Sequence, residues 1–482
     1  MTKPQSQLNA QSVKYLKRND TMKKTAKKRS ISKKNQPETL KLTIDSLDNS
    51  GIGLAPHENK IALVQGAFPG ETVIAEVEHT GRTHIFTKLQ RVLRNSPQRT
   101  TNVACKVADE CLGCPLIAMK YADQLLFKQQ RVAEALLQQG LLDDVQVLPV
   151  LPSDPNFGYR ASAKLVFSRN REKVLIGLYK RGSHDVIDCS ECPVHHPLIN
   201  KIAEVVRDEV QRQKISVYKS QQQRGLLRHL LIRVSPFSGK ALVTFVCNFR
   251  DLQQLPKLAK ALTKKVPEVI GVHQNLNSSS GNVILGEKTL KLQGLPDLIE
   301  RVGDIRLRIS PEAFFQINTV QATRIYALVR EWANLNKQDR VIDLYCGIGG
   351  IALHLAKDAG EVEGIETVAG AVRNATENSR LNNLPNCRFF TGDAAEELQK
   401  HGGRELSLVT INPPRKGCSV ELLQTLYQLK PKQIIYVSCD PDSLASDLKV
   451  LTDNGYKIKR LQPVDMFPQT AHIETVVQLR RD

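Results

Sequence analysis

Residues 341–350 read Val-Ile-Asp-Leu-Tyr-Cys-Gly-Ile-Gly-Gly, and this stretch decides the fold of the C-terminal part of the chain. The first four residues are typical of a short buried strand, and the glycines that follow indicate a tight turn. Mostly apolar residues over 351–355 predict a helix, and a second strand over 361–365 ends at Glu366, nineteen residues past Gly347. This order of elements predicts an α/β unit that binds a nucleoside.

The residues of this loop narrow the choice of ligand. Its glycines let the backbone approach a nucleoside closely, and Glu366 is placed to hold ribose hydroxyls. The loop begins at Asp343 instead of a phosphate-cradling G-x-G-x-x-G, which disfavours a pyrophosphate and suits a ligand with a cationic or amino group. S-adenosylmethionine (SAM) has these properties, and we expect Asp393, after a third strand, to take its adenine amino group.

Two more predicted strands end in residues that could bind a ligand or take part in a reaction. The turn Asn412-Pro413-Pro414-Arg415 closes the fourth strand, and Cys439 follows the fifth strand at 434–438. The carboxyl ends of parallel strands meet at one sheet edge, where open α/β sheets bind ligands. A cysteine that ends a buried strand is ordinarily inert packing, whereas beside a cofactor it can be a nucleophile. The residues alone leave both readings of Cys439 open.

Length and charge set the broad class. A chain of 482 residues predicts about three domains, and its formal charge of +19 and pI of about 9.5 favour a polyanionic partner such as nucleic acid. Residues 1–36 hold eleven basic residues and one acidic residue, and the remainder is still basic. The sequence shows no secretory signal and no membrane-spanning apolar stretch, so we expect a cytoplasmic protein without a membrane segment.

Four regions follow from composition and periodicity. Residues 1–36 are expected to be a disordered basic arm that touches RNA phosphates, and 37–97 a small β-barrel. Residues 98–318 predict a central α+β domain on an antiparallel sheet, and 319–482 the nucleoside-binding domain. Basic residues gather at the end of the predicted barrel, where they suit nucleic acid: Lys88, Arg91, Arg94 and Arg99.

Clustered cysteines indicate a metal centre in the central domain. Cys105, Cys111 and Cys114 have C-x5-C-x2-C spacing, which lets three thiols converge on one centre. A fourth ligand must come from elsewhere, and Cys189 and Cys192 are the two candidates. Four thiolates suit zinc or an iron–sulfur cluster, and the Cys-Pro ending favours the cluster.

With these motifs in order, the chain resembles the SAM-dependent uracil-C5 RNA methyltransferases, in particular the bacterial class that methylates 23S rRNA and carries an iron–sulfur cluster. The resemblance covers nearly everything from about residue 37 onward. It implies a multidomain α/β protein with an OB-like TRAM barrel, a central α+β domain with an iron–sulfur site and a Rossmann-like SAM methyltransferase domain. The matching segments are 105–114, Phe315–Asn318, Asp343–Gly349 with Glu366, Val437–Cys439 and His472–Glu474.

The resemblance also implies roles for individual residues. Cys439 is the expected nucleophile and Glu474 the expected general base, although Glu474 taken alone would be read as a surface glutamate. The expected cofactor-binding residues are Gln316, Tyr345, Gly347, Glu366, Asp393 and Asn412. The expected ligands of a [4Fe-4S] cluster are Cys105, Cys111, Cys114 and Cys192, where the family pattern selects Cys192 over Cys189.

Two positions depart from the family pattern. Asn412 stands where the family commonly has Asp, and Gly350 stands where a relative carries Asn. An amide can still present an oxygen or its NH₂ to a pyrimidine, so recognition is expected to change in strength. Gly350 removes one expected cofactor contact. These departures bear on substrate choice more than on the class of reaction.

The expected function is methyl transfer from SAM to C5 of a uridine in RNA by a monomeric enzyme, with 23S rRNA as the expected target and tRNA as the alternative. One competing reading is an amino-group methyltransferase with an Asn-Pro-Pro-aromatic turn, but Arg415 occupies the aromatic position. Another is a non-catalytic zinc-binding or RNA-binding assembly protein, which needs neither Cys439 nor SAM.

Overall fold

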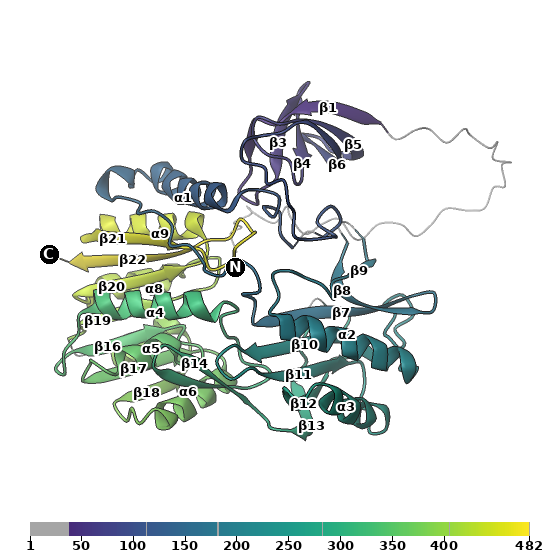
Figure 1. Ribbon diagram of the computed structural model, residues 1–482. Helices are drawn as coiled ribbons and strands as arrows, with labels where there is room; N and C mark the ends of the chain where they lie inside the picture. The colour runs from purple at the N-terminus through teal and green to yellow at the C-terminus, as the bar shows by residue number, and fades with distance from the viewer. Residues whose placement is uncertain (1–37, 112, 181–182, 282, 404, 482) are drawn as a thin grey trace, which may run out of the picture.

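The structure is a computed structural model that describes residues 38–481 apart from 112, 181–182, 282 and 404 (Figure 1). The predicted basic arm at 1–36 therefore lies outside the described residues. Three large sheets follow one another along the chain, with six, seven and seven strands, and a two-stranded hairpin separates the last two. None of the helices described is long and apolar enough to cross a membrane.

The N-terminal sheet is built from short strands with one apolar face. Its strands are β1 (Thr39–Thr43), β2 (Ser46–Leu47), β3 (Gly53–His57), β4 (Lys60–Val64), β5 (Thr72–Thr80) and β6 (His84–Arg94). They lie in the order β1-β5-β6-β4-β3-β2. Leu42, Val64 and Val73 pack in its core, as the period-two alternation of the sequence predicts. Closure of this sheet into a barrel stays a prediction.

Arg99 does not belong to a free basic cluster, which corrects an expectation from the sequence. Its guanidinium donates to both carboxylate oxygens of the buried Glu71, at 2.5 and 2.7 Å, and lies over the ring of Phe68. The ion pair therefore joins the segment after β6 to the turn before β5. Lys88, Arg91 and Arg94 remain exposed on β6.

The central sheet is covered by helices on one face. Its strands are β7 (Ser162–Asn170), β8 (Lys173–Tyr179), β9 (Val186–Asp188), β10 (Leu227–Ser235), β11 (Lys240–Cys247), β12 (Val269–Leu276) and β13 (Lys288–Gly294). The amphipathic helices α2 (Pro197–Arg212) and α3 (Gln254–Lys265) pack their apolar stripes on it. The expected antiparallel sheet is wrong at one pair: β11 and β12 are parallel, because α3 connects them as a crossover.

The C-terminal sheet has the doubly wound arrangement that the glycine-rich loop predicts. Its strands are β16 (Arg340–Leu344), β17 (Glu361–Glu366), β18 (Cys387–Thr391), β19 (Leu408–Ile411), β20 (Gln433–Ser438), β21 (Tyr456–Val464) and β22 (Glu474–Arg481). The order is β18-β17-β16-β19-β20-β22-β21, with the first five parallel and β22 antiparallel to both neighbours. Strand order reverses between β16 and β19, which is where such sheets bind ligands.

Helices cover both faces of this sheet, so its strands are apolar on both sides. One face carries α4 (Thr319–Ala333), α5 (Gly350–Leu355) and α6 (Ala369–Leu381). The other carries α7 (Ala394–His401), α8 (Val420–Leu429) and α9 (Pro441–Asp453). The hairpin β14 (Leu298–Val302) and β15 (Ile305–Ile309) packs beside α6 and joins the first of these cores.

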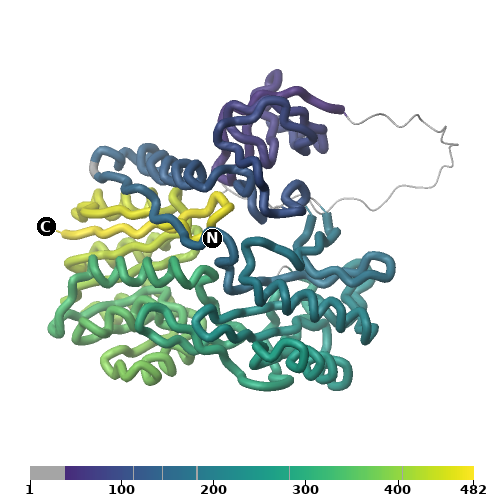
Figure 2. Tube along the Cα trace, viewed as in Figure 1, coloured from purple at the N-terminus to yellow at the C-terminus, as the bar shows by residue number. Residues whose placement is uncertain are grey.

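Helix α1 (Tyr121–Gln138) packs on the C-terminal domain although it ends about 200 residues before the first strand of the C-terminal sheet in the chain. Val132 and Leu136 join the core formed by α8 and α9, and Figure 2 shows α1 beside the C-terminal segment. Lys128 and Asp465 form a fully buried ion pair at 2.5 Å, and Tyr121 donates to the same carboxylate. The loop between β21 and β22 is therefore tied to α1.

Candidate active site

A cavity of about 1160 Å³ opens at the carboxyl ends of the parallel C-terminal strands. Most of the residues expected at the site line it. They are Gln316, Tyr345, Gly347, Glu366, Asn412, Cys439 and Glu474. The wall opposite the strand ends comes from the segment before α4 and from β13 of the central sheet, so the cavity lies between two of the three sheets.

Cys439 and Glu474 are brought together by the pairing of β20 with β22. The register places Ser438 opposite Thr475, so the next pair along these antiparallel strands is Cys439 and Glu474. Burial and then the charge of Glu474 raise the pKa of the half-buried Cys439 thiol to about 11, and the charge of Arg415 opposes this rise. The thiolate is the nucleophilic form of cysteine, so this thiol must lose its proton before it can act as a nucleophile.

Glu474 is buried in the wall of the cavity and is not a surface residue. It is 4% exposed, and burial raises the pKa of its carboxyl to about 8, against a smaller opposing effect of Arg415. A carboxyl with a pKa near neutral pH can both accept and release a proton during a reaction. The surface reading of Glu474 is therefore wrong.

The glycine-rich loop is held by the acid that follows β17. One carboxylate oxygen of Glu366 accepts from the Gly347 amide at 3.2 Å, and the other accepts from the Val368 amide at 2.9 Å. Tyr345 has a left-handed backbone, with a φ of 59°, which is uncommon for a residue with a side chain. The loop therefore turns sharply into the cavity, and Glu366 stays at its rim.

Asp343 does not line the cavity, which corrects the expectation from the sequence that this acid faces the ligand. It is 1% exposed. Its carboxylate accepts from the Thr410 hydroxyl at 2.5 Å and from the Ala352 amide at 3.0 Å. Burial raises the pKa of this carboxyl to about 7. Asp343 therefore ties β16 to β19 and to α5 as a structural group.

Asp393 also has a structural contact of its own. Its carboxylate caps α7 by accepting from the amides of Ala395 and Glu396, and Asp393 is not among the residues that line the cavity. Gln316 and Asn412 do line the cavity, and the backbone of Asn412 donates to the carbonyl of Leu344. The end of β19 is thereby held against the glycine-rich loop.

Two cavity residues were not assigned a role from the sequence. Arg415 donates to the imidazole of His472 at 3.2 Å, and both side chains lie beside Cys439 and Glu474. Burial and the charge of Arg415 lower the pKa of His472 to about 4, so His472 is neutral. The sequence signal for Arg415 was its place in the turn after the fourth strand, which lies next to the strand that precedes Cys439.

The departure at Gly350 has a steric reason. A Cβ at this position would meet Tyr326 of α4, with 2.6 Å to the hydroxyl oxygen and 2.9 Å to the ring carbon that carries it. The ring of Tyr326 thus fills the space that a side chain at 350 would need. Tyr326 itself lines the cavity, and nothing in the local sequence indicated this role.

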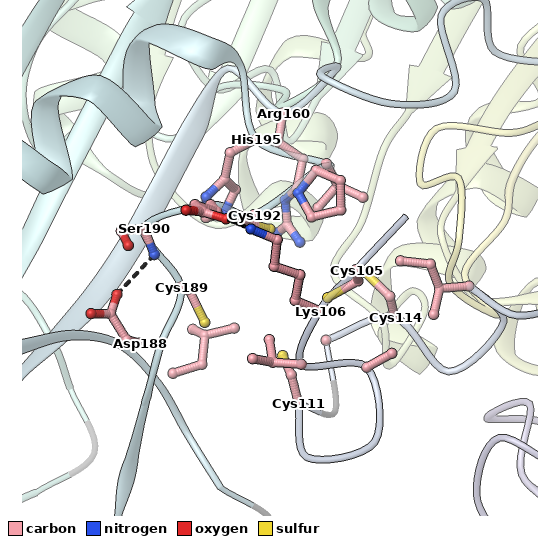
Figure 3. Close-up of a pocket in the computed structure, with 18 residues that line it drawn as sticks. Cys105, Lys106, Cys111, Cys114, Arg160, Asp188, Cys189, Ser190, Cys192 and His195 are labelled. Carbon is pink, nitrogen blue, oxygen red and sulfur yellow. Dashed lines mark hydrogen bonds and ion pairs between the residues drawn. The ribbon is translucent and has the colours of Figure 1, made fainter. Parts of the chain in front are cut away.

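The clustered cysteines line a second cavity of about 160 Å³, shown in Figure 3. Its thiols come from the loop at 105–114 and from the segment between β9 and α2: Cys105, Cys111, Cys114, Cys189 and Cys192. Burial raises the pKa of Cys114 to about 12, and a hydrogen bond from Cys189 is the main reason that the pKa of Cys111 falls to about 6. The expected convergence on one point is not seen: within the described residues, no three His, Cys, Asp or Glu side chains are placed to hold a metal ion.

Comparison with known proteins defines the class to which this fold and site belong. Residues 120–482 match the model of the tRNA (uracil-5-)-methyltransferase family, and the chain belongs to that family. It is 44% identical over 444 residues to an uncharacterized RNA methyltransferase of Geobacter sulfurreducens, covering 92% of this chain and 90% of the relative. It is 35% identical over 449 residues to one of Bacillus cereus, covering 92% of this chain and 97% of the relative.

A solved structure shares the architecture over nearly the whole chain. It is the tRNA (uracil-54, C5)-methyltransferase of Pyrococcus abyssi in complex with S-adenosyl-L-homocysteine. The two superpose with a TM-score of 0.74 at 26% identity, over 91% of this chain and 100% of the other. The fold of this chain is therefore similar to that of a uracil methyltransferase with bound S-adenosyl-L-homocysteine.

Proposed function

We propose that this protein transfers the methyl group of SAM to C5 of a uridine in RNA. The observation that carries the proposal is the pairing of Cys439 with Glu474 in the cavity that also holds the Glu366-bound loop. An amino-group methyltransferase has no use for a thiol beside a buried carboxyl of raised pKa. A non-catalytic assembly protein has no use for the cavity.

The chemistry follows from the poor nucleophilicity of uracil C5. The Cys439 thiolate adds to C6, the π electrons of the C5–C6 double bond move to C5 and its conjugated carbonyl, and C5 forms a bond to the methyl carbon as the methyl–sulfur bond breaks. Glu474 then removes the C5 proton, and the electrons of that C–H bond restore the C5–C6 double bond and expel the Cys439 thiolate. Arg415 is placed to favour the thiolate, because its positive charge lowers the pKa of Cys439.

The positioning of two substrates supplies much of the rate. Holding two reactants in line removes roughly 7–11 kcal/mol of entropic barrier in well-oriented reactions. Glu366 and the loop from Tyr345 to Gly347 would bind SAM, with Gln316 and Asn412 on the opposite sides of the cavity. The cap formed by Asp393 makes its expected contact with adenine depend on a water or on a small shift. A base inside a helix cannot reach Cys439, so the target is flipped out or single-stranded.

We infer that an iron–sulfur cluster occupies the cavity lined by the five thiols. Thiolates are the ligands of such clusters, and Cys105, Cys111, Cys114 and Cys192 would hold one. When bound, it would cross-link the loop at 105–114 to the segment after β9.

The RNA target divides into two candidates. The resemblance of the cysteine motif favours 23S rRNA, whereas the family name and the Pyrococcus abyssi neighbour favour tRNA. The predicted TRAM-like sheet at 37–97 would contact either RNA through Lys88, Arg91 and Arg94, which are exposed on β6. Mapping of 5-methyluridine in 23S rRNA and tRNA from a deletion strain decides between them: the residue that loses its methyl group is the target.

A covalent trap tests the reaction itself. RNA that carries 5-fluorouridine has no C5 proton for Glu474 to remove, so a SAM-dependent, denaturation-resistant complex with Cys439 is expected on gels and in peptide mass spectra. Cys418→Ala serves as the control, because Cys418 lies near the same strand ends but does not line the cavity. A wild-type enzyme that methylates RNA without ever forming this complex would refute the covalent mechanism.

A further inference from the structure

The hydroxyl of Tyr326 is an unused polar group in the wall of the active-site cavity. Tyr326 is 7% exposed, and its ring packs on His354 with a centroid distance of 5.1 Å. In the part of the chain that the structure describes, the hydroxyl has no hydrogen-bond partner, although it faces the cavity. The hydroxyl is therefore free to donate a hydrogen bond to a ligand in the cavity.

The position of this hydroxyl is fixed from two sides. It lies against Gly350, since a Cβ there would be 2.6 Å from the oxygen. It also lies within the fields of Asp343 and Glu474, whose negative charges, after burial, raise the pKa of Tyr326. The phenol therefore stays neutral across the working pH range and retains a proton to donate.

The groups around the cavity indicate which part of the ligand reaches Tyr326. Glu366 stands at the ribose end, next to Gly347, and Cys439 with Glu474 stands where the target base must react. The transferred methyl group must lie between these two ends. The wall formed by Tyr326 and Gly350, between the loop and Glu474, is left for the amino-acid end of SAM, which branches from the same sulfur.

We propose that the Tyr326 hydroxyl donates a hydrogen bond to the carboxylate of the methionine part of SAM and so fixes the position of the transferred methyl group. This inference rests on the proposed function. It adds to the site a residue from α4, outside the motifs that the sequence singled out. The absence of a side chain at Gly350 is then what leaves room for the phenol.

The test compares two ligands on two tyrosine variants by calorimetry. Tyr326→Phe keeps the ring and removes only the hydroxyl, so thermal unfolding should be unchanged. We expect it to bind SAM roughly tenfold more weakly, as for a lost hydrogen bond to a charged group, and to bind decarboxylated SAM as the wild type does. Tyr427→Phe, on the outer face of α8 and 44% exposed, should bind both ligands normally.

Steady-state kinetics provide a second measurement on Tyr326→Phe. The KM for SAM should rise in Tyr326→Phe while the KM for RNA stays unchanged. Equal weakening of SAM and decarboxylated SAM, or no weakening of either, would overturn the inference and leave the proposed function intact. A wild-type protein that binds neither ligand would instead refute the proposed function, and the inference would fall with it.

Discussion

The two cysteine-bearing regions of this protein differ in how their reactive groups are placed. At the sheet edge, Cys439 directly follows β20 and Glu474 begins β22, and the register of these two strands sets them side by side. In the thiol cavity, five cysteines come from loops, and no three of the described acidic, histidine or cysteine side chains are arranged around one ion. The pairing of strands sets the relative positions of Cys439 and Glu474 without a ligand. The loops around the thiol cavity do not set the positions of the five thiols in the same way.

The largest effect is expected from removal of the Cys439 thiol at the sheet edge. Cys439→Ala should lower methylation by at least about 10³-fold, because a covalent nucleophile has no substitute in the cavity. Binding of SAM and the thermal midpoint should change little, since the thiol is half-buried and holds no other group in place. Methylation assays and calorimetry check both points. Activity within tenfold of wild type would show that Cys439 is inert packing after all.

Replacement of the base should stop the reaction at a later point. Glu474→Gln keeps the shape of the side chain but cannot accept the C5 proton, so turnover should fall by roughly 10²–10⁴-fold. The methylated adduct on Cys439 should then accumulate with ordinary, unfluorinated RNA. Denaturing gels with labelled SAM measure it, and a variant that turns over slowly with no adduct would assign the proton transfer to another group.

The raised pKa of Glu474 predicts opposite pH trends for rate and stability. The rate should increase as pH rises through about 8, because the carboxylate form is the base. The folded protein binds this proton more tightly than the unfolded chain, so its contribution to stability is complete below about pH 4.5 and is lost as pH rises toward 8. Glu474→Gln should therefore gain stability relative to wild type as pH rises. Chemical denaturation at pH 5 and pH 8 measures this difference, and an equal difference at both would contradict the shift.

The thiol cavity should respond to substitution in a different way. Cys105→Ser should lose bound iron and acid-labile sulfide and lower the thermal midpoint by several degrees, because it removes a link between two loops. SAM binding at the sheet edge should persist, since strands hold that site. Cys189→Ser is the matched control and should retain iron. Iron lost from Cys189→Ser and kept in Cys105→Ser would exchange the roles of the two thiols.

The smallest expected effect lies in the N-terminal sheet. Arg91→Ala should weaken RNA binding a few-fold and reduce the salt dependence of the affinity by about one counterion. Arg99→Ala should instead lower the thermal midpoint, because it leaves the buried carboxylate of Glu71 without its ion-pair partner. Salt titrations of RNA binding and thermal melts compare the two variants. Equal salt slopes for Arg91→Ala and wild type would remove β6 from the RNA-binding surface.

The sequence predicted best the places of residues that lie at the ends of strands. Gly347, Glu366, Asn412 and Cys439 all follow predicted strands, and the shared edge of a parallel sheet brings such residues together whatever lies between them in the chain. The antiparallel sheet predicted for the central region also agrees with the structure, except for the parallel pair made by the α3 crossover.

The errors concern where side chains point. Asp343 stands at an expected strand end, yet its carboxylate is buried against the Thr410 hydroxyl. Asp393 caps α7, and its expected contact with adenine stays a prediction. Arg99 pairs with Glu71, which lies 28 residues away and carries no signal in the local pattern. Contacts of this kind depend on tertiary packing, which periodicity does not contain.

The packing of α1 on the C-terminal sheet has a consequence for synthesis of the chain. Tyr121 and its partner Asp465 are 344 residues apart. At roughly 5–20 residues per second, a ribosome needs on the order of 20 s to a minute to make the second after the first. Throughout that interval the apolar stripe of α1, with Val132 and Leu136, has no surface to cover it. The nascent chain therefore carries an exposed hydrophobic helix that a chaperone can hold until α9 and the loop after β21 have been made.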